Sequence, residues 1–247
     1  MSDKEMSKRQ QRKEQIRRKE KNSRLMSIGL VTVGVIFLAI LFIWPQVKPI
    51  DAVVSAPEVN IPVSDFNTAG NPDAPIRIDE YADFQCPYCR RFFENTEALL
   101  MNNYVANGTV YFVYHSFGEF IGPESSAAAE AAYCAGDQNK FWQMSSTLYA
   151  NQTGENVGAF NDRRIQAFAE LIELNMEEFN SCLDTNKYAD LIKQDGEDAL
   201  AAGIQATPSF VLTYTVNGEV KTKQLQGAQS YEVFQQEIEA ALAEMNK

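Results

Sequence analysis

The residues of this sequence best suited to chemistry are two cysteines, Cys86 and Cys89, with Pro87 and Tyr88 between them. They follow a short apolar run and precede a helical pattern. A thiol in the first turn of a helix meets unpaired backbone N–H groups and the positive end of the helix dipole, which both favour the thiolate. We therefore expect Cys86 to be the reactive sulfur and Cys89 to close a disulfide with it. The spacing alone is equally compatible with a structural disulfide or half of a zinc site.

The charge distribution separates a basic N-terminal tail from an acidic remainder. Residues 1–24 hold ten Lys or Arg and four Asp or Glu, a net charge of +6, whereas the rest of the chain holds 12 and 29, a net charge of −17. Phosphate recognition requires clustered cations. The acidic body therefore argues against nucleic-acid binding, and the basic tail is better explained by the segment that follows it.

That segment, residues 25–44, is apolar and carries no charge. A helix of this length spans about 30 Å, the thickness of the hydrocarbon core of a bilayer. The basic tail then places the N-terminus in the cytoplasm and the remaining chain outside. A cleaved signal peptide is the alternative, but its apolar region is normally ~7–15 residues, and Ser55-Ala56 lies too far downstream for its cleavage site. We expect a single-pass anchor in the cell membrane.

Outside the cytoplasm disulfides form and persist, so the remaining two cysteines are also expected to be paired. Proximity pairs Cys86 with Cys89, which leaves Cys134 and Cys182 for a second, structural disulfide. It would close a loop of ~49 residues and contribute ~4 kcal/mol. A second redox relay through these two cysteines is the alternative. Zinc bound by all four is disfavoured, because structural zinc sites usually draw their ligands from two tight pairs. No metal is expected.

The patterns that surround the first cysteine pair predict a strand–helix–strand unit. Four prolines punctuate residues 45–65, which predicts an extended linker before a folded domain over 66–247. Residues 76–82 are predicted to be a strand, the residues after the cysteines a helix that ends at Asn107-Gly108, and 109–114 a second strand. The connection of such a βαβ unit is right-handed.

The C-terminal half predicts a helical block followed by a hairpin. Residues 121–203 show helical periodicity in several segments, which indicates an all-helical insertion. Asn217-Gly218 lies between two β-prone runs and is a strong hairpin signal. An amphipathic pattern over 231–245 predicts a terminal helix. The expected order is β-α-β, a helical block, and β-β-α.

This order resembles the thioredoxin fold, and its large helical insertion is similar to the DsbA-like family of thiol-disulfide oxidoreductases. The resemblance covers about residue 63 to the C-terminus and implies an α/β thioredoxin fold with an inserted all-helical subdomain. The single N-terminal transmembrane helix expected from the apolar segment precedes this fold and, like the linker, lies outside the resemblance. The motifs that carry it are Tyr81-Ala82-Asp83-Phe84-Gln85-Cys86-Pro87-Tyr88-Cys89, Ala132-Tyr133-Cys134-Ala135 with Lys140-Phe141-Trp142, and Ala206-Thr207-Pro208-Ser209-Phe210.

The resemblance also implies roles for residues that lie far from the cysteines in the sequence. Pro208 is expected to be a cis-proline that faces the active-site disulfide and leaves the backbone of Thr207 available to an extended substrate segment. Glu80, on the apolar face of its strand, matches a buried acid that could relay a proton to or from Cys89. A partly exposed glutamate at the end of the strand is the alternative.

Pro87 and Tyr88 are expected to contact substrate, and at Tyr88 the sequence departs from the most strongly oxidising pattern of the family. That pattern has a histidine in this position, which stabilises the thiolate by its charge. A tyrosine offers a hydroxyl and an aromatic surface but no positive charge. Because 30 mV corresponds to about 1.4 kcal/mol, the loss of one charge contact shifts a reduction potential noticeably. We expect a milder oxidant.

The function implied is the formation of disulfides in reduced secreted proteins by exchange through Cys86 and Cys89, without a bound cofactor. By resemblance, an integral-membrane, quinone-linked partner would reoxidise the protein. A reductase or isomerase would use the same residues, and a non-catalytic binding module or chaperone is a further alternative. Intact Cys86, Cys89 and Pro208 argue against the latter. His115, the sole histidine, is expected to be a satisfied structural residue at a strand edge rather than a metal ligand.

Overall fold

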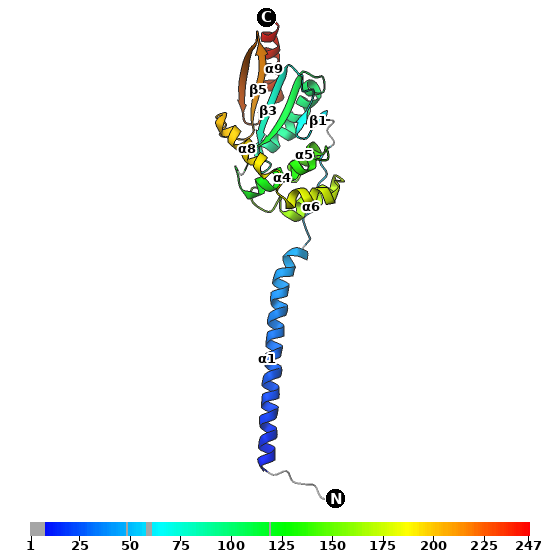
Figure 1. Ribbon diagram of the computed structural model, residues 1–247, viewed down its shortest axis with the longest axis vertical. Coiled ribbons are helices and arrows are strands. Elements are labelled where there is room, and N and C mark those ends of the chain that lie inside the picture. Colours follow the sequence, from blue (N-terminus) through cyan, green and yellow to red (C-terminus); the bar gives the residue numbers. More distant parts are fainter. Residues whose placement is uncertain (1–7, 48, 58–60, 119) are drawn as a thin grey trace. The chain divides into compact units, whose positions relative to one another are not determined.

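The computed structural model describes residues 8–47, 49–57, 61–118 and 120–247, so the first seven residues of the predicted basic tail lie outside the described residues. The chain divides into two compact units, Met1–Asp51 and Ala52–Lys247, and each is described by itself. Figure 1 shows the ribbon of both units.

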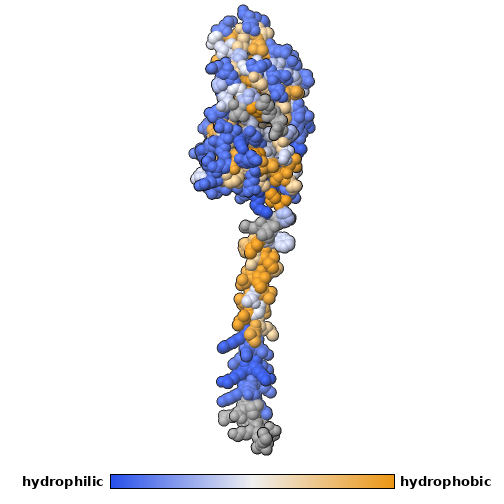
Figure 2. Space-filling view, turned by 90° about the vertical axis from the view of Figure 1, so that its right-hand side faces the viewer, coloured by the Kyte–Doolittle hydropathy of each residue, from blue (hydrophilic) through white to orange (hydrophobic). Residues whose placement is uncertain are grey.

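The described part of the first unit is dominated by one long helix, α1 (Lys8–Val47). Its portion Gln11–Trp44 is long and apolar enough to cross a membrane. Figure 2 shows the two parts of this helix, a hydrophilic stretch followed by a hydrophobic one. The predicted span over 25–44 is thus helical, and the helix also runs back through the basic tail, whose Lys, Arg, Gln and Glu residues are good helix formers.

The second unit is built on a six-stranded sheet in the order β1-β2-β4-β3-β5-β6. The central strands β3 and β4 are parallel, and every other pairing is antiparallel. The predicted βαβ unit is confirmed, with Ile76 beside Val110 and Ala82 beside Ser116. The strands are β1 (Val63–Asp65), β2 (Thr68–Ala69), β3 (Ile76–Ala82), β4 (Val110–Ser116), β5 (Ser209–Val216) and β6 (Glu219–Gln226).

The C-terminal hairpin β5–β6 turns at Asn217-Gly218, as predicted. Both residues have positive φ, 51° and 81°, the combination that a two-residue hairpin turn of the right twist requires. Helix α9 (Tyr231–Met245) follows it. Phe234 of this helix packs against Phe210 of β5, with ring centroids 4.8 Å apart. The ring centroid of Phe92, in the helix that follows the two cysteines, lies 4.6 Å from that of Phe210. The hairpin, α9 and this helix therefore share the main core.

The helix after the cysteines is one helical run over 87–105 with two widened segments. It consists of α2 (Pro87–Phe92), the π-helical segment η1 (Phe93–Glu97), α3 (Ala98–Leu100) and the π-helical segment η2 (Met101–Val105). The sequence predicted a regular α-helix here. A π-turn holds one more residue than an α-turn and so shifts which side chains face the core.

The inserted subdomain is all-helical, as predicted, and a disulfide between Cys134 and Cys182 joins two of its helices, with the Cα atoms of the two cysteines 5.8 Å apart. The predicted pairing of Cys134 with Cys182 is thus present, and its structural role stays a prediction. The helices are α4 (Pro123–Gly136), α5 (Phe141–Ala150), α6 (Asp162–Leu171), α7 (Met176–Asp184) and α8 (Ala189–Ala201).

Part of the range 45–65, predicted to be an extended linker, lies against the folded domain. The backbone N–H of Val54 donates to Asn151 Oδ1 and its carbonyl accepts from Asn151 Nδ2, both at 2.8 Å. Val53 and Ile61 pack on the main core. The folded unit accordingly begins at Ala52, within the range 45–65 predicted to be linker. A single side-chain amide pairing with one peptide unit leaves no periodic signal in the sequence.

Candidate active site

Cys86 lies at the N-cap of α2, with backbone φ −71° and ψ 122°, and Pro87 occupies the first helical turn. Proline suits this position because its missing N–H would have no partner in the first turn and its fixed φ fits the helix. Cys86 is 5% exposed and Cys89 is fully buried. Both are free thiols, so the structure describes the dithiol form. Both sulfur-bearing residues are therefore largely covered, Cys89 completely.

The surroundings of Cys86 favour its thiolate. A hydrogen bond from the Cys89 thiol is the largest cause, burial opposes it, and the N–H groups of Cys89 and Tyr88 in the first helical turn add to it, which lowers the pKa of Cys86 to about 6. Burial raises the pKa of Cys89 well above its usual value, and the neighbouring Cys86 raises it further. One sulfur is thus poised to react and leave as an anion, while the other holds its proton.

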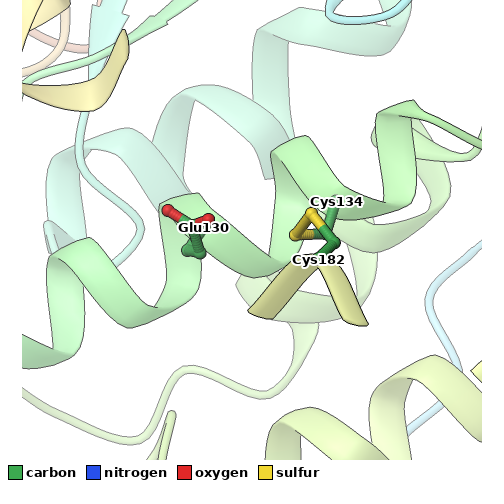
Figure 3. A group of neighbouring side chains, drawn as sticks. All are labelled: Glu130, Cys134 and Cys182. Carbon is green, nitrogen blue, oxygen red and sulfur yellow. A yellow bond between two sulfur atoms is a disulfide. The ribbon is translucent and has the colours of Figure 1, made fainter. Parts of the chain in front are cut away.

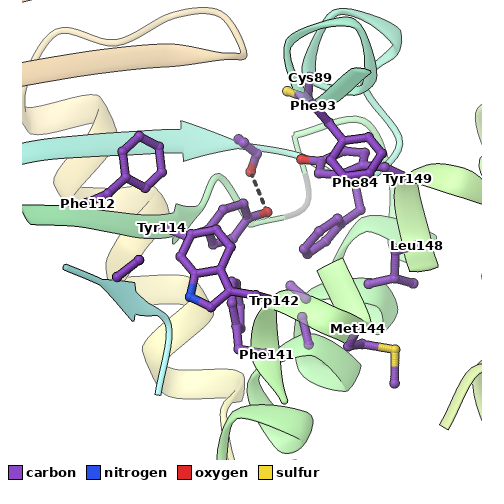
Figure 4. Close-up of a cluster of buried hydrophobic side chains, with 14 of the residues drawn as sticks. Phe84, Cys89, Phe93, Phe112, Tyr114, Phe141, Trp142, Met144, Leu148 and Tyr149 are labelled. Atoms are coloured by element: carbon purple, nitrogen blue, oxygen red, sulfur yellow. Dashed lines mark hydrogen bonds between the residues drawn. The ribbon is translucent and has the colours of Figure 1, made fainter. Parts of the chain in front are cut away.

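Cys89 lies at the edge of a dense aromatic cluster. Figure 4 shows it beside Phe93, with Phe84, Tyr114 and Tyr149 in the same group. Phe84 stacks on Tyr114 at 5.2 Å between centroids, and Phe93 stacks on Tyr149 at 5.4 Å. These rings exclude water from Cys89, whose Sγ accepts a hydrogen bond of 3.5 Å from the backbone N–H of Asp83.

The peptide bond between Thr207 and Pro208 is cis, which confirms the predicted cis-proline. It places the Thr207 carbonyl 3.3 Å from Cys86 Sγ, although the two residues are 121 positions apart in the chain. The carbonyl of Pro208 accepts a hydrogen bond of 2.7 Å from the N–H of Gly227 just beyond β6. The loop before β5 is therefore fixed from behind, with the backbone of Thr207 turned toward the reactive sulfur.

The outer rim of the site is formed by Pro87 and Tyr88, both exposed. Tyr88 is 54% exposed, and the guanidinium of Arg91 lies 5.2 Å from the centroid of its ring. The ring itself carries no charge, as predicted, but the structure adds a cation on its surface that the sequence analysis did not anticipate. This geometry is that of a cation–π contact.

Glu80 is buried beneath the cysteines in the central strand, between Tyr114 and Phe210 of the flanking strands. Its 2% exposure excludes the alternative of a partly exposed glutamate. Burial, and then the neighbouring carboxyl of Glu97, raise the pKa of Glu80 well above its usual value. Glu97 is 3% exposed, and burial raises its pKa to about 8. Two buried carboxyl groups with raised pKa values therefore lie close to the active site.

The carboxyl group of Glu130 lies beside the disulfide between Cys134 and Cys182 (Figure 3). A carboxylate oxygen of Glu130 and the two sulfurs lie within 4.8 Å of one another. Because the sulfurs are bonded to each other, they carry no thiolate charge for a metal. Glu130 instead accepts a hydrogen bond of 2.8 Å from the N–H of Tyr188, which helps to hold the segment that leads into α8.

His115 is satisfied, as predicted, but it does not lie on an edge strand. Strand β4 is inside the sheet, and both ring nitrogens of His115 face carboxylates. Nε2 lies 2.8 Å from Asp79 Oδ1 and Nδ1 lies 3.0 Å from Asp195 Oδ1. Asp195 belongs to α8, so the histidine joins the sheet to the inserted helices. We call Asp79, His115 and Asp195 the histidine clasp.

Two residues that contact or underlie the site were missed in the sequence. Glu97 lies in the π-helical segment η1, where its carboxyl group is buried. Gln152 follows α5 at a separation of 66 residues from Cys86, and its side chain donates to the Cys86 carbonyl. A polar residue between Asn151 and Thr153 carries no signal of such a contact.

The pKa of Cys86 leads to a prediction for alkylation of the reduced protein. The rate of reaction with iodoacetamide should rise with pH around a midpoint of about 6 and level off roughly one unit higher, because the thiolate is the nucleophile. Mass spectrometry should find the label on Cys86, with Cys89 labelled only after denaturation. A Cys86→Ala variant, which lacks the fast reaction, is the control. A midpoint close to 9 would contradict the described environment.

A CxxC pair at the start of the helix in a βαβ unit, facing a cis-proline before an antiparallel strand, defines the class of thioredoxin-fold proteins, and the helical block between the two halves is that of DsbA-like members. A family model described as Thioredoxin matches residues 65–240. The chain therefore belongs to this thioredoxin family.

Solved structures show the same fold. Alpha-DsbA1 of Wolbachia pipientis superposes with a TM-score of 0.63 at 21% identity, over 77% of this chain and 94% of that one. BdbD of Bacillus subtilis, in its oxidised form, superposes with a TM-score of 0.62 at 23% identity, over 78% of this chain and 100% of that one.

Curated relatives fall into two kinds. A probable disulfide bond formation protein D of Bacillus anthracis is 28% identical over 156 residues, which is 61% of this chain and 69% of the relative. A Na(+)/H(+) antiporter NhaA 1 of Salinispora arenicola is 31% identical over 141 residues, which is 57% of this chain and 20% of the relative. The match thus spans about a fifth of the antiporter's length and most of the disulfide bond formation protein.

Proposed function

We propose that the protein is a membrane-anchored, extracytoplasmic thiol-disulfide oxidoreductase that forms disulfides in reduced secreted proteins. The observation that carries this proposal is the pairing of an acidic thiol, Cys86, with a buried, protonated thiol, Cys89, opposite cis-Pro208. Similarity to a probable disulfide bond formation protein D and to DsbA-like structures supports the same chemistry.

In the proposed reaction the Cys86–Cys89 disulfide is the oxidant. A substrate thiolate attacks Cys86 Sγ, the bond between Cys86 and Cys89 breaks, and a mixed disulfide forms on Cys86. The second substrate thiol then attacks its own bridged sulfur, and Cys86 leaves as a thiolate. The substrate loses two electrons and two protons, and the protein gains the dithiol. The lowered pKa of Cys86 makes it the better leaving group in the second step.

Glu80 is the group best placed to handle the proton of Cys89. Cys89 leaves as a thiolate in the first step, inside a site where its pKa is strongly raised. A neutral carboxyl in the same buried region can supply that proton. Glu80, whose pKa is raised by burial and by Glu97, meets this requirement. We assign it the role of proton relay, with Glu97 as the neighbour that keeps it protonated.

The substrate is expected to lie across the rim formed by Pro87 and Tyr88, with its backbone against Thr207. The position beside Cys86 and the exposure of both rim residues support this placement. Because the residue between the cysteines is a tyrosine and not a histidine, the protein is proposed to be a milder oxidant than the strongest DsbA-like members. Arg91 places a cation over the face of the Tyr88 ring, on the rim that the substrate is proposed to contact.

The membrane anchor and the need for reoxidation complete the proposal. One described helix is long and apolar enough to cross a membrane, and the basic residues before it favour a cytoplasmic N-terminus. The folded domain is then outside the cytoplasm, where disulfides persist. Each turnover leaves Cys86 and Cys89 reduced, so a membrane-embedded, quinone-linked oxidase is the proposed electron acceptor.

The decisive experiment uses a Cys89→Ala variant of the full-length protein. Without Cys89 the mixed disulfide cannot be resolved from within the active site, so secreted proteins should accumulate as covalent adducts on Cys86 that vanish on reduction. The Cys86→Ala/Cys89→Ala double variant is the matched control. Absence of adducts in the single variant would overturn the proposal. In wild-type cells, Cys86–Cys89 should be mostly oxidised, whereas a mostly reduced pair would indicate a reductase.

A further inference from the structure

Gln152 lies behind the active-site loop and binds it directly. Its side chain is 7% exposed, and Nε2 donates to the carbonyl of Phe84 at 2.6 Å and to the carbonyl of Cys86 at 3.1 Å. Because both neighbours are carbonyl oxygens, only the NH2 end of the amide can face them. We propose that Gln152 is a positioning residue of the redox site, which holds the Cys86 peptide and favours the Cys86 thiolate.

The backbone of Gln152 is tied to the same part of the molecule. Its carbonyl accepts a hydrogen bond of 2.9 Å from Nη1 of Arg90, the residue after Cys89. Arg90 is itself held by Glu94 one turn later, at 2.7 Å. The segment after α5 and the start of α2 are therefore linked in both directions: the Gln152 side chain donates to the Cys86 carbonyl, and the Gln152 carbonyl accepts from Arg90. This reciprocity fixes where the amide points.

The side-chain amide of Gln152 donates to the carbonyl of Cys86, the residue that carries the reacting sulfur. The Cys86 carbonyl accepts the first helical hydrogen bond of α2, from the N–H of Arg90 at 3.1 Å. A carbonyl oxygen carries partial negative charge, which disfavours a thiolate on the same residue. A second N–H directed at that oxygen offsets part of this charge. Because the thiolate exists only in the reduced protein, the effect favours the reduced form over the oxidised one.

The loop has other attachments that do not involve Gln152. The Gln85 side chain donates to Ser125 Oγ at 2.9 Å and accepts from the N–H of Asn156 at 2.6 Å. Asp83 accepts from the N–H of Gln85 at 2.8 Å and from that of Ile121 at 3.2 Å. These contacts hold the loop in place when the Gln152 amide is removed. Its loss should therefore be felt mainly at Cys86.

The test is a Gln152→Leu variant of the full-length protein, which keeps the approximate shape of the side chain and removes the amide. Gln143→Leu, at an exposed position of α5, is the matched control. The thiolate absorbance of the reduced protein gives the pKa of Cys86, and equilibration with reduced and oxidised glutathione gives the redox equilibrium constant. We expect Gln152→Leu to raise the pKa and to shift the equilibrium constant about threefold to tenfold toward the oxidised protein.

A merely structural role gives a different result. Loss of packing lowers the melting temperature of the oxidised and reduced proteins equally, whereas loss of the proposed effect lowers that of the reduced protein more. An unchanged pKa and redox equilibrium constant, with equal loss of stability in both forms, would overturn the inference. If Gln152→Leu does not fold, Gln152→Asn, which retains the amide but withdraws it by one methylene, must show the same shifts in smaller size.

The inference rests on the proposed function only in that Cys86 is the redox-active thiol. The pKa and the glutathione equilibrium are measured on the protein alone, without a substrate or a membrane partner. A failure of the Gln152 prediction therefore leaves the trapping experiment untouched. If trapping fails but Gln152→Leu shows the raised pKa of Cys86, Gln152 still favours the Cys86 thiolate. The thiols with which Cys86 exchanges would then not be those of secreted proteins.

Discussion

Replacing Phe210 with alanine is expected to lower the free energy of unfolding by about 3–5 kcal/mol. Phe210 is fully buried, two residues after the cis-proline in β5, and contacts Phe92 of the active-site helix and Phe234 of α9. Removal of the ring leaves a cavity where three elements meet, and the two remaining rings cannot both move into it. Chemical denaturation followed by circular dichroism measures the change.

Val220→Ala, on the partner strand of the same hairpin, is the control for Phe210→Ala. Val220 is 64% exposed, so its truncation should change the free energy of unfolding by no more than about 0.5 kcal/mol. The loss at Phe210 should be equal in the oxidised and reduced proteins, because the ring is uncharged and packs against other rings. A loss below about 1 kcal/mol would mean that the core closes around the cavity.

Removing the imidazole of the histidine clasp, by His115→Leu, should cost about 3 kcal/mol of unfolding free energy at pH 7. The substitution leaves the carboxylates of Asp79 and Asp195, 9% and 5% exposed, without the cation between them. Breaking one side of a buried ionic group typically costs 3–5 kcal/mol. The lower end of this range is expected for His115→Leu, because Asp79 keeps a hydrogen bond from Arg77 and Asp195 keeps one from Tyr133.

The contribution of the clasp should also depend on pH. Burial lowers the pKa of His115, but the hydrogen bonds to Asp195 and Asp79 outweigh it and raise the pKa to about 9, above the usual 6.5. Stabilisation from the charged imidazole is therefore complete below about 6.5 and lost as the pH rises through about 9. Tyr81 stacks on the ring but, with a pKa of about 12, stays neutral over this range.

Unfolding free energies of the wild-type protein and His115→Leu, measured at several pH values, test this expectation. The gap between the two proteins should narrow from about 3 kcal/mol at pH 7 as the pH passes through about 9. The control is Lys193→Gln, which breaks an exposed ion pair with Glu197 on the same helix as Asp195 and should cost less than about 1 kcal/mol. A gap that is independent of pH would show that the ring is neutral.

The features that could be predicted from the sequence are those determined by residues close together in the chain. The alternating pattern of β3, the Asn217-Gly218 turn and the proline after the first redox cysteine each specify a backbone geometry within a few residues. Motif resemblance then supplied the long-range relation between Cys86 and Pro208. The pairing of Cys134 with Cys182 followed because only two cysteines remained once the adjacent pair was assigned.

What could not be predicted depends on contacts between distant segments with no distinctive residue type. Gln152 and Asp195 are ordinary polar residues on the helices and loops of the insertion, and nothing in their neighbourhoods points to Cys86 or His115. Glu97 was missed because a glutamate within a helix is usually exposed, and nothing in its neighbours indicates a buried carboxyl group. The docking of Val54 on Asn151 uses backbone groups, which every sequence contains.

The Cys134–Cys182 disulfide also determines how the molecule responds to proteolysis. The bridge turns the chain between its two cysteines into a covalent ring, and this ring contains the exposed segment around Val157, which is 64% exposed. A protease that cuts this segment opens the ring but releases no fragment, because both ends stay attached through the sulfurs. A cleaved molecule therefore migrates as two pieces only after reduction, and the bridge keeps Pro208 on the same covalent body as Cys86.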